Sequence, residues 1–285
     1  MSAPPPLPPN LRHDAFAGLA DDYVRYRLPY PAPMVEAILI EARIPPAGAR
    51  AIDLACGTGR VALAIAPRFA NVRAVDLEPE MVEAGRREAR RLRVSNILWS
   101  VGSAEDFEAP AGAFHLVTAG DSFHRLDRPR VAARALGWLA PAGALVTLGS
   151  EGFLDGDAPW RRVLAVVVRA FVGEPARRLG APNAPIAEEI ADQEAVLRAA
   201  GFAPVVSRDF EIAHEWPLPE LLGNLRSTSV LSRAALGERH EAFEAALTAA
   251  LLAHDPSGRY AETVRFGYTV AHKPAAARRS AIRAW

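Results

Sequence analysis

The sequence has a single cysteine, a single lysine and no net charge. An internal disulfide is therefore excluded, since Cys56 has no partner in the chain. The 33 basic and 33 acidic residues cancel, and apart from Lys273 the basic residues are arginines. This balance removes any global electrostatic attraction to nucleic acid or to an anionic membrane. We expect neither as a partner.

Long apolar runs, targeting features and metal-ligand clusters are also missing. The most apolar segment, residues 163–168, is stopped by Arg169 and is too short to span a bilayer. The proline-rich start lacks the charged flank and apolar stretch of a secretion signal. No cysteine and histidine cluster has zinc spacing, so we expect no metal. These absences predict a cytoplasmic protein, either a monomer or a homodimer.

The 285 residues are half apolar and can bury one large core. Residues 1–12 are rich in proline and are expected to be disordered. Residues 13–273 are expected to form one domain, and residues 274–285 a loose tail.

Within this domain, buried strands and amphipathic helices alternate. Such alternation is typical of a doubly wound, mostly parallel α/β sheet. A helical cap is predicted over the edge of the sheet where a ligand would bind. It is expected to consist of residues 13–31, 151–186 and 213–259. Seven strands are expected, at residues 50–54, 72–77, 96–101, 114–119, 143–148, 204–212 and 263–271.

The strongest motif is the segment AIDLACGTGR at residues 51–60, a strand that runs into a glycine turn and a helix. Gly57 and Gly59 let backbone amides approach a ligand, and the helix start behind them favours an anionic group. The pattern also fits a dinucleotide fingerprint. However, Asp53 would repel a pyrophosphate and could hold an ammonium, which favours a ligand with an amino acid end.

This stretch resembles motif I of the class I S-adenosylmethionine-dependent methyltransferases, and the resemblance continues along the chain. Asp76 ends the second strand, where the family has a ribose-binding carboxylate. The resemblance implies a Rossmann-like methyltransferase fold and S-adenosylmethionine as cofactor. It places these residues around that cofactor: Tyr23, Arg27, Asp53, Ala55, Gly57, Gly59, Asp76, Leu77, Met81, Ser103, Ala104, Glu105 and Gly120.

Two of these groups have particular expected roles. The loop of Ser103, Ala104 and Glu105 is expected to cover the adenine, and Gly120 is expected near the methionine end. The segment from Tyr23 to Pro31 is similar to the branch that contains trans-aconitate methyltransferase and many natural-product methyltransferases. In that branch the segment folds over the bound cofactor.

The resemblance implies methyl transfer to a small-molecule acceptor, with oxygen (hydroxyl or carboxylate) favoured over nitrogen or carbon and a role in natural-product biosynthesis. His124 is a candidate general base, although it could equally orient a loop through Asp127. If the acceptor is a carboxylate, Arg226 and Arg27 are the candidate clamp. From their positions, the acceptor pocket is expected to contain Phe123, Phe153, Trp160, Trp216, Arg226 and Tyr268.

Two other functions stay open at this point. A protein of this fold could bind S-adenosylmethionine without transferring the methyl group, as a cyclase-like or regulatory protein. An NAD-dependent oxidoreductase is the second alternative, which the position of Asp53 disfavours.

Overall fold

The structure is a computed structural model, and it describes residues 16–152, 154, 156–173 and 186–275. The predicted disorder of residues 1–12, most of the predicted tail and residues 174–185 of the predicted cap lie outside the described residues.

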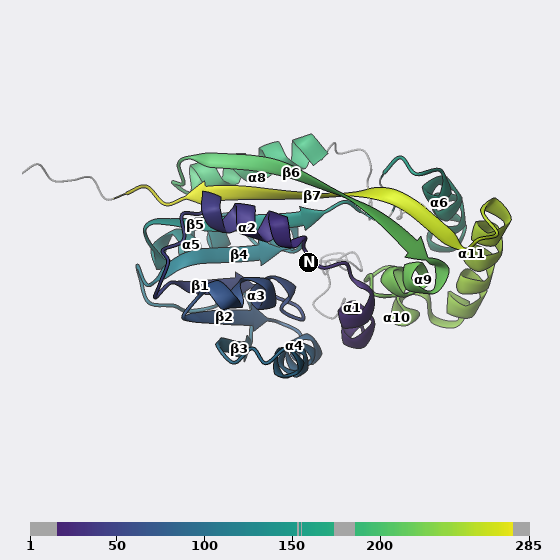
Figure 1. The fold of residues 1–285 in the computed structure, drawn as a ribbon, viewed down its shortest axis with the longest axis horizontal. Coiled ribbons are helices and arrows are strands. Elements are labelled where there is room, and N and C mark those ends of the chain that lie inside the picture. The colour runs from purple at the N-terminus through teal and green to yellow at the C-terminus, as the bar shows by residue number, and fades with distance from the viewer. Residues whose placement is uncertain (1–15, 153, 155, 174–185, 276–285) are drawn as a thin grey trace, which may run out of the picture.

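Seven strands form one sheet in the order β3-β2-β1-β4-β5-β7-β6 (Figure 1). β1 to β5 are parallel to one another, whereas β7 runs antiparallel to both β5 and β6. The predicted fold class, a mostly parallel seven-stranded sheet, is confirmed. The strands are β1 (Arg50–Leu54), β2 (Asn71–Asp76), β3 (Ile97–Val101), β4 (Phe114–Gly120), β5 (Leu139–Ser150), β6 (Val205–Pro217) and β7 (Arg259–His272).

Helices cover both faces of the sheet and form a separate group at one end. In Figure 1, α2 and α3 lie in front of the sheet and α5 and α8 behind it. The longer helices are α1 (Ala20–Tyr26), α2 (Ala32–Glu41), α3 (Arg60–Ile65), α4 (Pro79–Arg91), α5 (Arg128–Trp138), α6 (Pro159–Val172), α8 (Ile186–Ala199), α9 (Leu218–Arg226) and α11 (His240–His254). Shorter ones are α10 (Arg233–Leu236), η2 (Ala66–Arg68), η3 (Phe123–Arg125) and η4 (Gly237–Arg239).

Five of the chain's 24 prolines mark the starts of α-helices. A proline stands in the first two positions of α2, α4, α5, α6 and α9. Its fixed φ suits the first turn, where its missing N–H has no partner to lose. At α5 the Asp127 carboxylate also accepts a hydrogen bond from Arg130 N at 3.2 Å. These prolines therefore help to determine the residues at which the helices begin.

β1 and β4 are buried on both faces, so neighbouring residues of these strands enter opposite cores. Ala51 and Leu116 face the core beneath α2 and α3, while Ile52 and Val117 face the core beneath α5 and α8. This is the alternation expected of a strand. It explains the near-continuous apolar runs of β1 and β4.

β6 and β7 are longer than predicted and form an antiparallel ribbon that extends past the rest of the sheet (Figure 1). Their register runs from Val205 opposite Ala271 to Pro217 opposite Arg259. The far end of this ribbon packs with α6, α9 and α11 around a third apolar core, in which Trp216, Tyr260 and Phe243 are buried. We call this group the cap.

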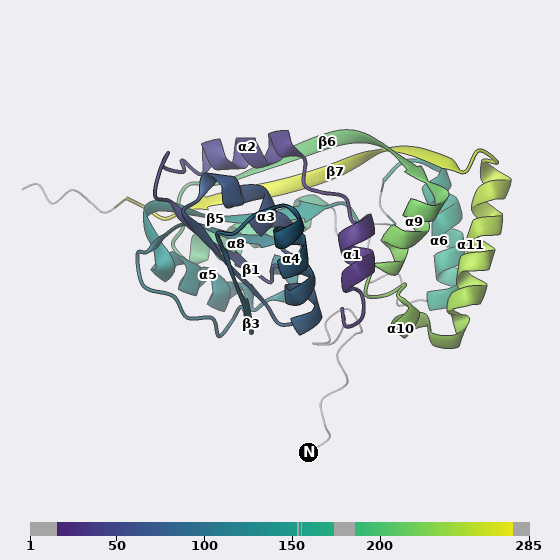
Figure 2. The ribbon, with the colours of Figure 1, turned by 60° about the horizontal axis from the view of Figure 1, so that its bottom comes forward.

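α1 lies between the sheet and the cap (Figure 2). Asp21 pairs with Arg87 of α4 at 2.9 Å, and Asp22 pairs with Arg226 of α9 at 3.2 Å. The ring of Tyr26 packs so closely on Gly223 that a Cβ there would lie 2.4 Å from it. One short helix therefore joins the cap to the cofactor side of the sheet.

A buried ion pair ties the cap's ribbon to α6. Arg161 Nε and Glu262 Oε2 are 2.5 Å apart, and their side chains are 7% and 2% exposed. Glu262 Oε1 also accepts from Trp216 Nε1 at 2.5 Å, while Arg161 donates to the Gly152 carbonyl at 2.9 Å.

We predict that Arg161→Met lowers the free energy of unfolding by about 3–5 kcal/mol, because it leaves the Glu262 charge buried without its partner. Denaturant unfolding followed by tryptophan fluorescence measures this. Arg265→Met is the control, since Arg265 lies on β7 like Glu262 but forms an exposed ion pair with Glu211. This substitution should leave stability nearly unchanged. Equal effects of the two substitutions would contradict the prediction.

Candidate functional site

The topology places a crevice at the carboxyl ends of β1 and β4. β1 and β4 are neighbours in the sheet, but the chain leaves them in opposite directions: from β1 it continues to β2, and from β4 to β5 on the other side. Such a switch point is where open α/β sheets bind ligands. The residues that follow the two strands, 55–60 and 121–125, therefore begin at this switch point.

The turn after β1 has three residues with left-handed backbone: Ala55, Gly57 and Gly59, with φ of 46°, 54° and 76°. The two glycines differ in what surrounds them. A Cβ on Gly57 would meet no atom within 4 Å, so this position opens into free space. A Cβ on Gly59 would lie 2.2 Å from the Trp99 ring. Gly57 therefore leaves room for a ligand, whereas Gly59 makes room for packing.

Asp76 at the end of β2 is joined to this turn. Its Oδ2 accepts from Gly57 N at 2.7 Å and its Oδ1 from Glu78 N at 2.9 Å. Burial raises the pKa of Asp76, while these two N–H groups and nearby Arg125 oppose the rise. A second lone pair remains on each carboxylate oxygen, which could accept the two hydroxyls of a ribose.

Asp53 on β1 is buried and joins two elements across the switch point. Its Oδ1 accepts from Thr118 Oγ1 of β4 at 2.7 Å, and its Oδ2 from Ala62 N of α3 at 3.0 Å. Burial raises the pKa of Asp53 to about 7, against the effect of these two hydrogen bonds. Asp53 therefore connects β1 to β4 and α3. Its carboxyl changes charge near neutral pH.

A small cavity opens beside the turn. Tyr23, Asp53 and Gly120 were predicted from the sequence to lie here, and the structure brings them together. The cavity is lined by Tyr23, Tyr30, Asp53, Cys56, Arg60, Val61 and Gly120.

Tyr30 was missed, although it lies in the Tyr23–Pro31 segment that carries the family resemblance. Its hydroxyl donates to Asp121 Oδ2 at 2.8 Å. Burial and the Asp121 carboxylate raise the pKa of Tyr30 well above its usual range, so the hydroxyl stays protonated. A Cβ on Gly120 would lie 2.8 Å from this hydroxyl, so the close packing requires glycine there.

A larger cleft of about 580 Å³ lies between the sheet edge and the cap. Trp160 and Trp216, which were expected in the acceptor pocket, line it, and so does Arg27, which was expected at the cofactor or in a carboxylate clamp. Arg60 lines both spaces and was missed, although it stands directly after the glycine turn. The lining residues are Arg27, Leu28, Arg60, Ser150, Glu151, Trp160, Arg161, Leu164, Trp216, Leu221, Asn224, Leu225, Glu262, Val264 and Phe266.

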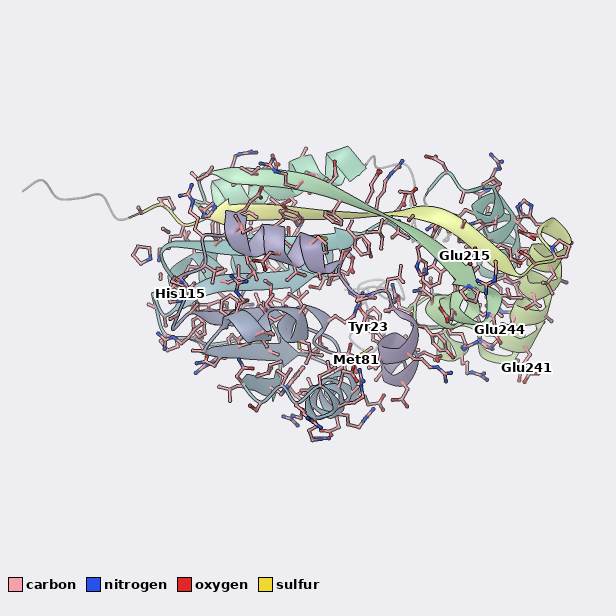
Figure 3. The ribbon with its side chains drawn as sticks, viewed as in Figure 1. Tyr23, Met81, His115, Glu215, Glu241 and Glu244 are labelled. Carbon is pink, nitrogen blue, oxygen red and sulfur yellow. The ribbon has the colours of Figure 1, made fainter. Side chains whose placement is uncertain are left out.

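The remaining predicted cofactor residues lie near Asp76 or beneath α1. Leu77, next to Asp76, is 43% exposed and offers an apolar surface. Ser103 Oγ donates to Glu105 Oε2 at 2.7 Å, while Ala104 is buried. Met81 is buried against α1, and Figure 3 shows it close to Tyr23 between α1 and α4.

Three residues expected in the acceptor pocket lie elsewhere. Phe123 is buried in the core beneath α5, and Tyr268 lies in the core beneath α2 on the opposite face of the sheet. Arg226 pairs with Asp22 and with Glu244, at 3.2 and 2.7 Å. These placements follow from strand register and cap packing, which the sequence does not reveal. Phe153 lies outside the described residues.

His124, the predicted general base, lies on η3 and is exposed. It lines neither the small cavity nor the large cleft. It follows β4, as the sequence indicated, after a turn at Asp121 with a φ of 50°.

The described residues contain no group of histidine, cysteine or carboxylate side chains that could hold a metal ion. Among the helices described, none has both the length and the apolar content needed to cross a bilayer.

Comparison with known proteins supports the family resemblance. Residues 51–143, about a third of the chain, match the methyltransferase domain family. A ubiquinone biosynthesis O-methyltransferase of Xanthomonas axonopodis pv. citri (strain 306) is 34% identical over 112 residues, 39% of this chain and 46% of that protein. The chain thus spans about half the length of the curated relatives it matches.

Solved structures share the fold. A candidate type II methyltransferase from Anaeromyxobacter dehalogenans matches 87% of this chain and 98% of its own at a TM-score of 0.59 and 24% identity. Phosphoethanolamine N-methyltransferase 2 of Haemonchus contortus, in complex with S-adenosylmethionine, matches 92% of this chain and 56% of its own at a TM-score of 0.53 and 18% identity. These likenesses show the fold alone. Together with the family match, they confirm the class I methyltransferase resemblance expected from the sequence.

We predict that Gly57→Ala weakens S-adenosylmethionine binding at least about tenfold, because the new methyl group occupies ligand space. Gly48→Ala is the matched control. Gly48 also has positive φ and open surroundings but precedes β1, at the opposite edge of the sheet. Both variants should lose about 1–2 kcal/mol of stability to backbone strain. Calorimetry that finds equal cofactor affinity in the two variants would show that the turn does not hold the ligand.

The raised pKa of Asp53 predicts how stability depends on pH. The folded protein binds this proton up to about pH 7, whereas the unfolded chain releases it near pH 3.8. The Asp53 carboxyl therefore does not lower the free energy of unfolding below about pH 4. As pH rises, it lowers the free energy of unfolding progressively, by about 4 kcal/mol at pH 7. Asp53→Asn keeps the shape without the charge.

The Asn variant should match wild type near pH 4 and exceed its stability by up to about 4 kcal/mol at pH 8. Denaturant unfolding of the cofactor-free proteins across this range tests it. A stability difference that does not change with pH would contradict the assigned pKa.

Proposed function

We propose, on the premise that residues 51–143 belong to the methyltransferase domain family, that the chain transfers the methyl group of S-adenosylmethionine to an oxygen of a small-molecule acceptor. The observation that carries this proposal is the pair of adjoining spaces that share Arg60: a small cavity at the glycine turn and a large cleft under the cap. Methyl transfer needs a donor site and an acceptor site that meet.

The residues of the small cavity fit the donor. Its lining suits the amino acid end of the cofactor, with Asp53 and the tyrosine hydroxyls as its polar groups. The ribose would lie on Asp76, and the adenine would extend toward exposed Leu77 and the Ser103–Glu105 loop. The open space at Gly57 is where a backbone can approach the ligand closely.

The cofactor supplies a methyl group that is already activated by the positive sulfonium. The protein then has to align the acceptor with it and to exclude water. Trp160 and Trp216 give the cleft apolar walls for this purpose. The naming of the curated relatives as O-methyltransferases supports an oxygen acceptor. A place in natural-product biosynthesis remains part of the proposal.

Cofactor binding and methyl transfer are tested separately. We predict saturable binding of S-adenosylmethionine by calorimetry and none of NAD. Asp76→Ala should weaken the binding by about 2–4 kcal/mol, because a charged acceptor of two hydroxyls is lost. Incubation with methyl-labelled cofactor and a metabolite extract should then give a labelled small molecule by mass spectrometry.

Unchanged affinity in Asp76→Ala would remove Asp76 from the ribose site. Tight binding of the cofactor without any labelled product would favour a protein that binds S-adenosylmethionine but does not transfer its methyl group. Micromolar binding of NAD would instead favour an oxidoreductase.

A further inference from the structure

Two arginines of the large cleft stand beside tyrosines of the small cavity. The Arg27 guanidinium lies 5.1 Å from the ring centre of Tyr23, and the Arg60 guanidinium lies 5.1 Å from that of Tyr30. Arg27 also donates to the Ser227 carbonyl at 3.3 Å, while its buried Nε has no hydrogen-bond partner. Within the described part of the chain, neither guanidinium forms an ion pair with a carboxylate.

The charges of the cleft leave an excess of one positive charge. Arg161 is neutralised by its buried pair with Glu262. Of the other lining residues, Arg27 and Arg60 are cationic and Glu151 is anionic. Two arginines therefore favour an anionic group on the ligand, and a carboxylate is such a group. An arginine is well suited to this, since its fork matches the two carboxylate oxygens.

The rest of the cleft is apolar. Its walls include Trp160, Trp216 and Phe266, together with several leucines from α6 and α9. A ligand that fits both features carries an acid group at one end and an apolar body at the other. Because Arg60 lines the small cavity as well, the acid end lies where the cleft meets the donor site.

We propose that the acceptor is an apolar carboxylic acid, and that its carboxylate is held by Arg27 and Arg60 and itself receives the methyl group. This inference rests on the proposed function and specifies its substrate class. The two arginines fit a carboxylate directly, and among the described residues no histidine lines either space; the carboxylates that do are Asp53, Glu151 and Glu262. A hydroxyl acceptor would need a base, whereas a carboxylate is already ionised at neutral pH.

The reaction balances without any further reactant. A carboxylate oxygen uses a lone pair to form a bond to the methyl carbon as the carbon–sulfur bond breaks. The electron pair of that bond stays on sulfur, which gives S-adenosylhomocysteine and a methyl ester, and no proton is lost. Because the ester is neutral, it loses its charge attraction to the two arginines, which assists its release.

The assay uses the full chain, methyl-labelled S-adenosylmethionine and three matched probe pairs: phenylacetate, hexanoate and decanoate, each beside its amide. We expect label on the acids and not on the amides. Alkali should release this label as volatile methanol, because an ester hydrolyses while a methyl ether or methylamine does not. Labelled products from a metabolite extract should be labile to alkali in the same way.

Arg27→Gln and Arg60→Gln should each lower kcat/KM for the best acid roughly 10–100-fold, as expected for a lost hydrogen bond to a charged group. Arg60→Lys should recover only part of this, because lysine keeps the charge but not the fork. Arg68→Gln is the control and should leave kcat/KM unchanged, because Arg68 is an exposed arginine of η2 that pairs with Glu36 outside both spaces.

As a second readout, calorimetry on the protein saturated with S-adenosylhomocysteine should show tighter binding of acids than of amides, and Arg27→Gln should reduce this preference. Labelled products that all resist alkali, or equal binding of acids and amides, would overturn the carboxylate assignment while leaving methyl transfer intact. Absence of any labelled product would count against the proposed function itself.

Discussion

The buried carboxylate of Asp53 is the contact on which the site depends. It joins β4 through Thr118 and the start of α3 through Ala62 N, and so fixes the glycine turn at the one place where the sheet's connections diverge. Asp76 completes this frame from β2 by accepting from Gly57 N. Burial of Asp53 raises its pKa to about 7, so ionising it at neutral pH costs stability. The Asp53 carboxylate thus lowers stability at neutral pH while it holds the glycine turn in place.

The second constraint is the ribbon of β6 and β7. Because these strands continue past the sheet, they hold the cap's core beside the ligand edge. The large cleft is thus lined from two cores, and α1 joins them through Arg87 on one side and Arg226 on the other. Figure 3 shows Glu244, the other partner of Arg226, on the cap side of this junction.

The sequence predicted the sheet because β1 to β4 are short and separated by clear turns and helix starts. The glycine turn and Asp76 could be predicted for the same reason, since they follow strands directly. Local patterns could not distinguish Gly57 from Gly59, because Gly59 packs against the ring of Trp99, which comes from β3. They also could not place Phe123, Tyr268 or Arg226, whose surroundings are set by the register of β7 and by the packing of the cap. Arg60 was adjacent to the motif, but only the cap shows that it faces two spaces.

The central claim is that the switch point holds S-adenosylmethionine, with its ribose on Asp76 and its amino acid end beside Asp53 and Gly120. A crystal structure of the protein with S-adenosylhomocysteine tests this most directly. The account predicts both ribose hydroxyls within hydrogen-bond distance of the Asp76 carboxylate and the ligand backbone passing Gly57. A ligand bound away from the turn, or a ribose without contact to Asp76, would contradict it.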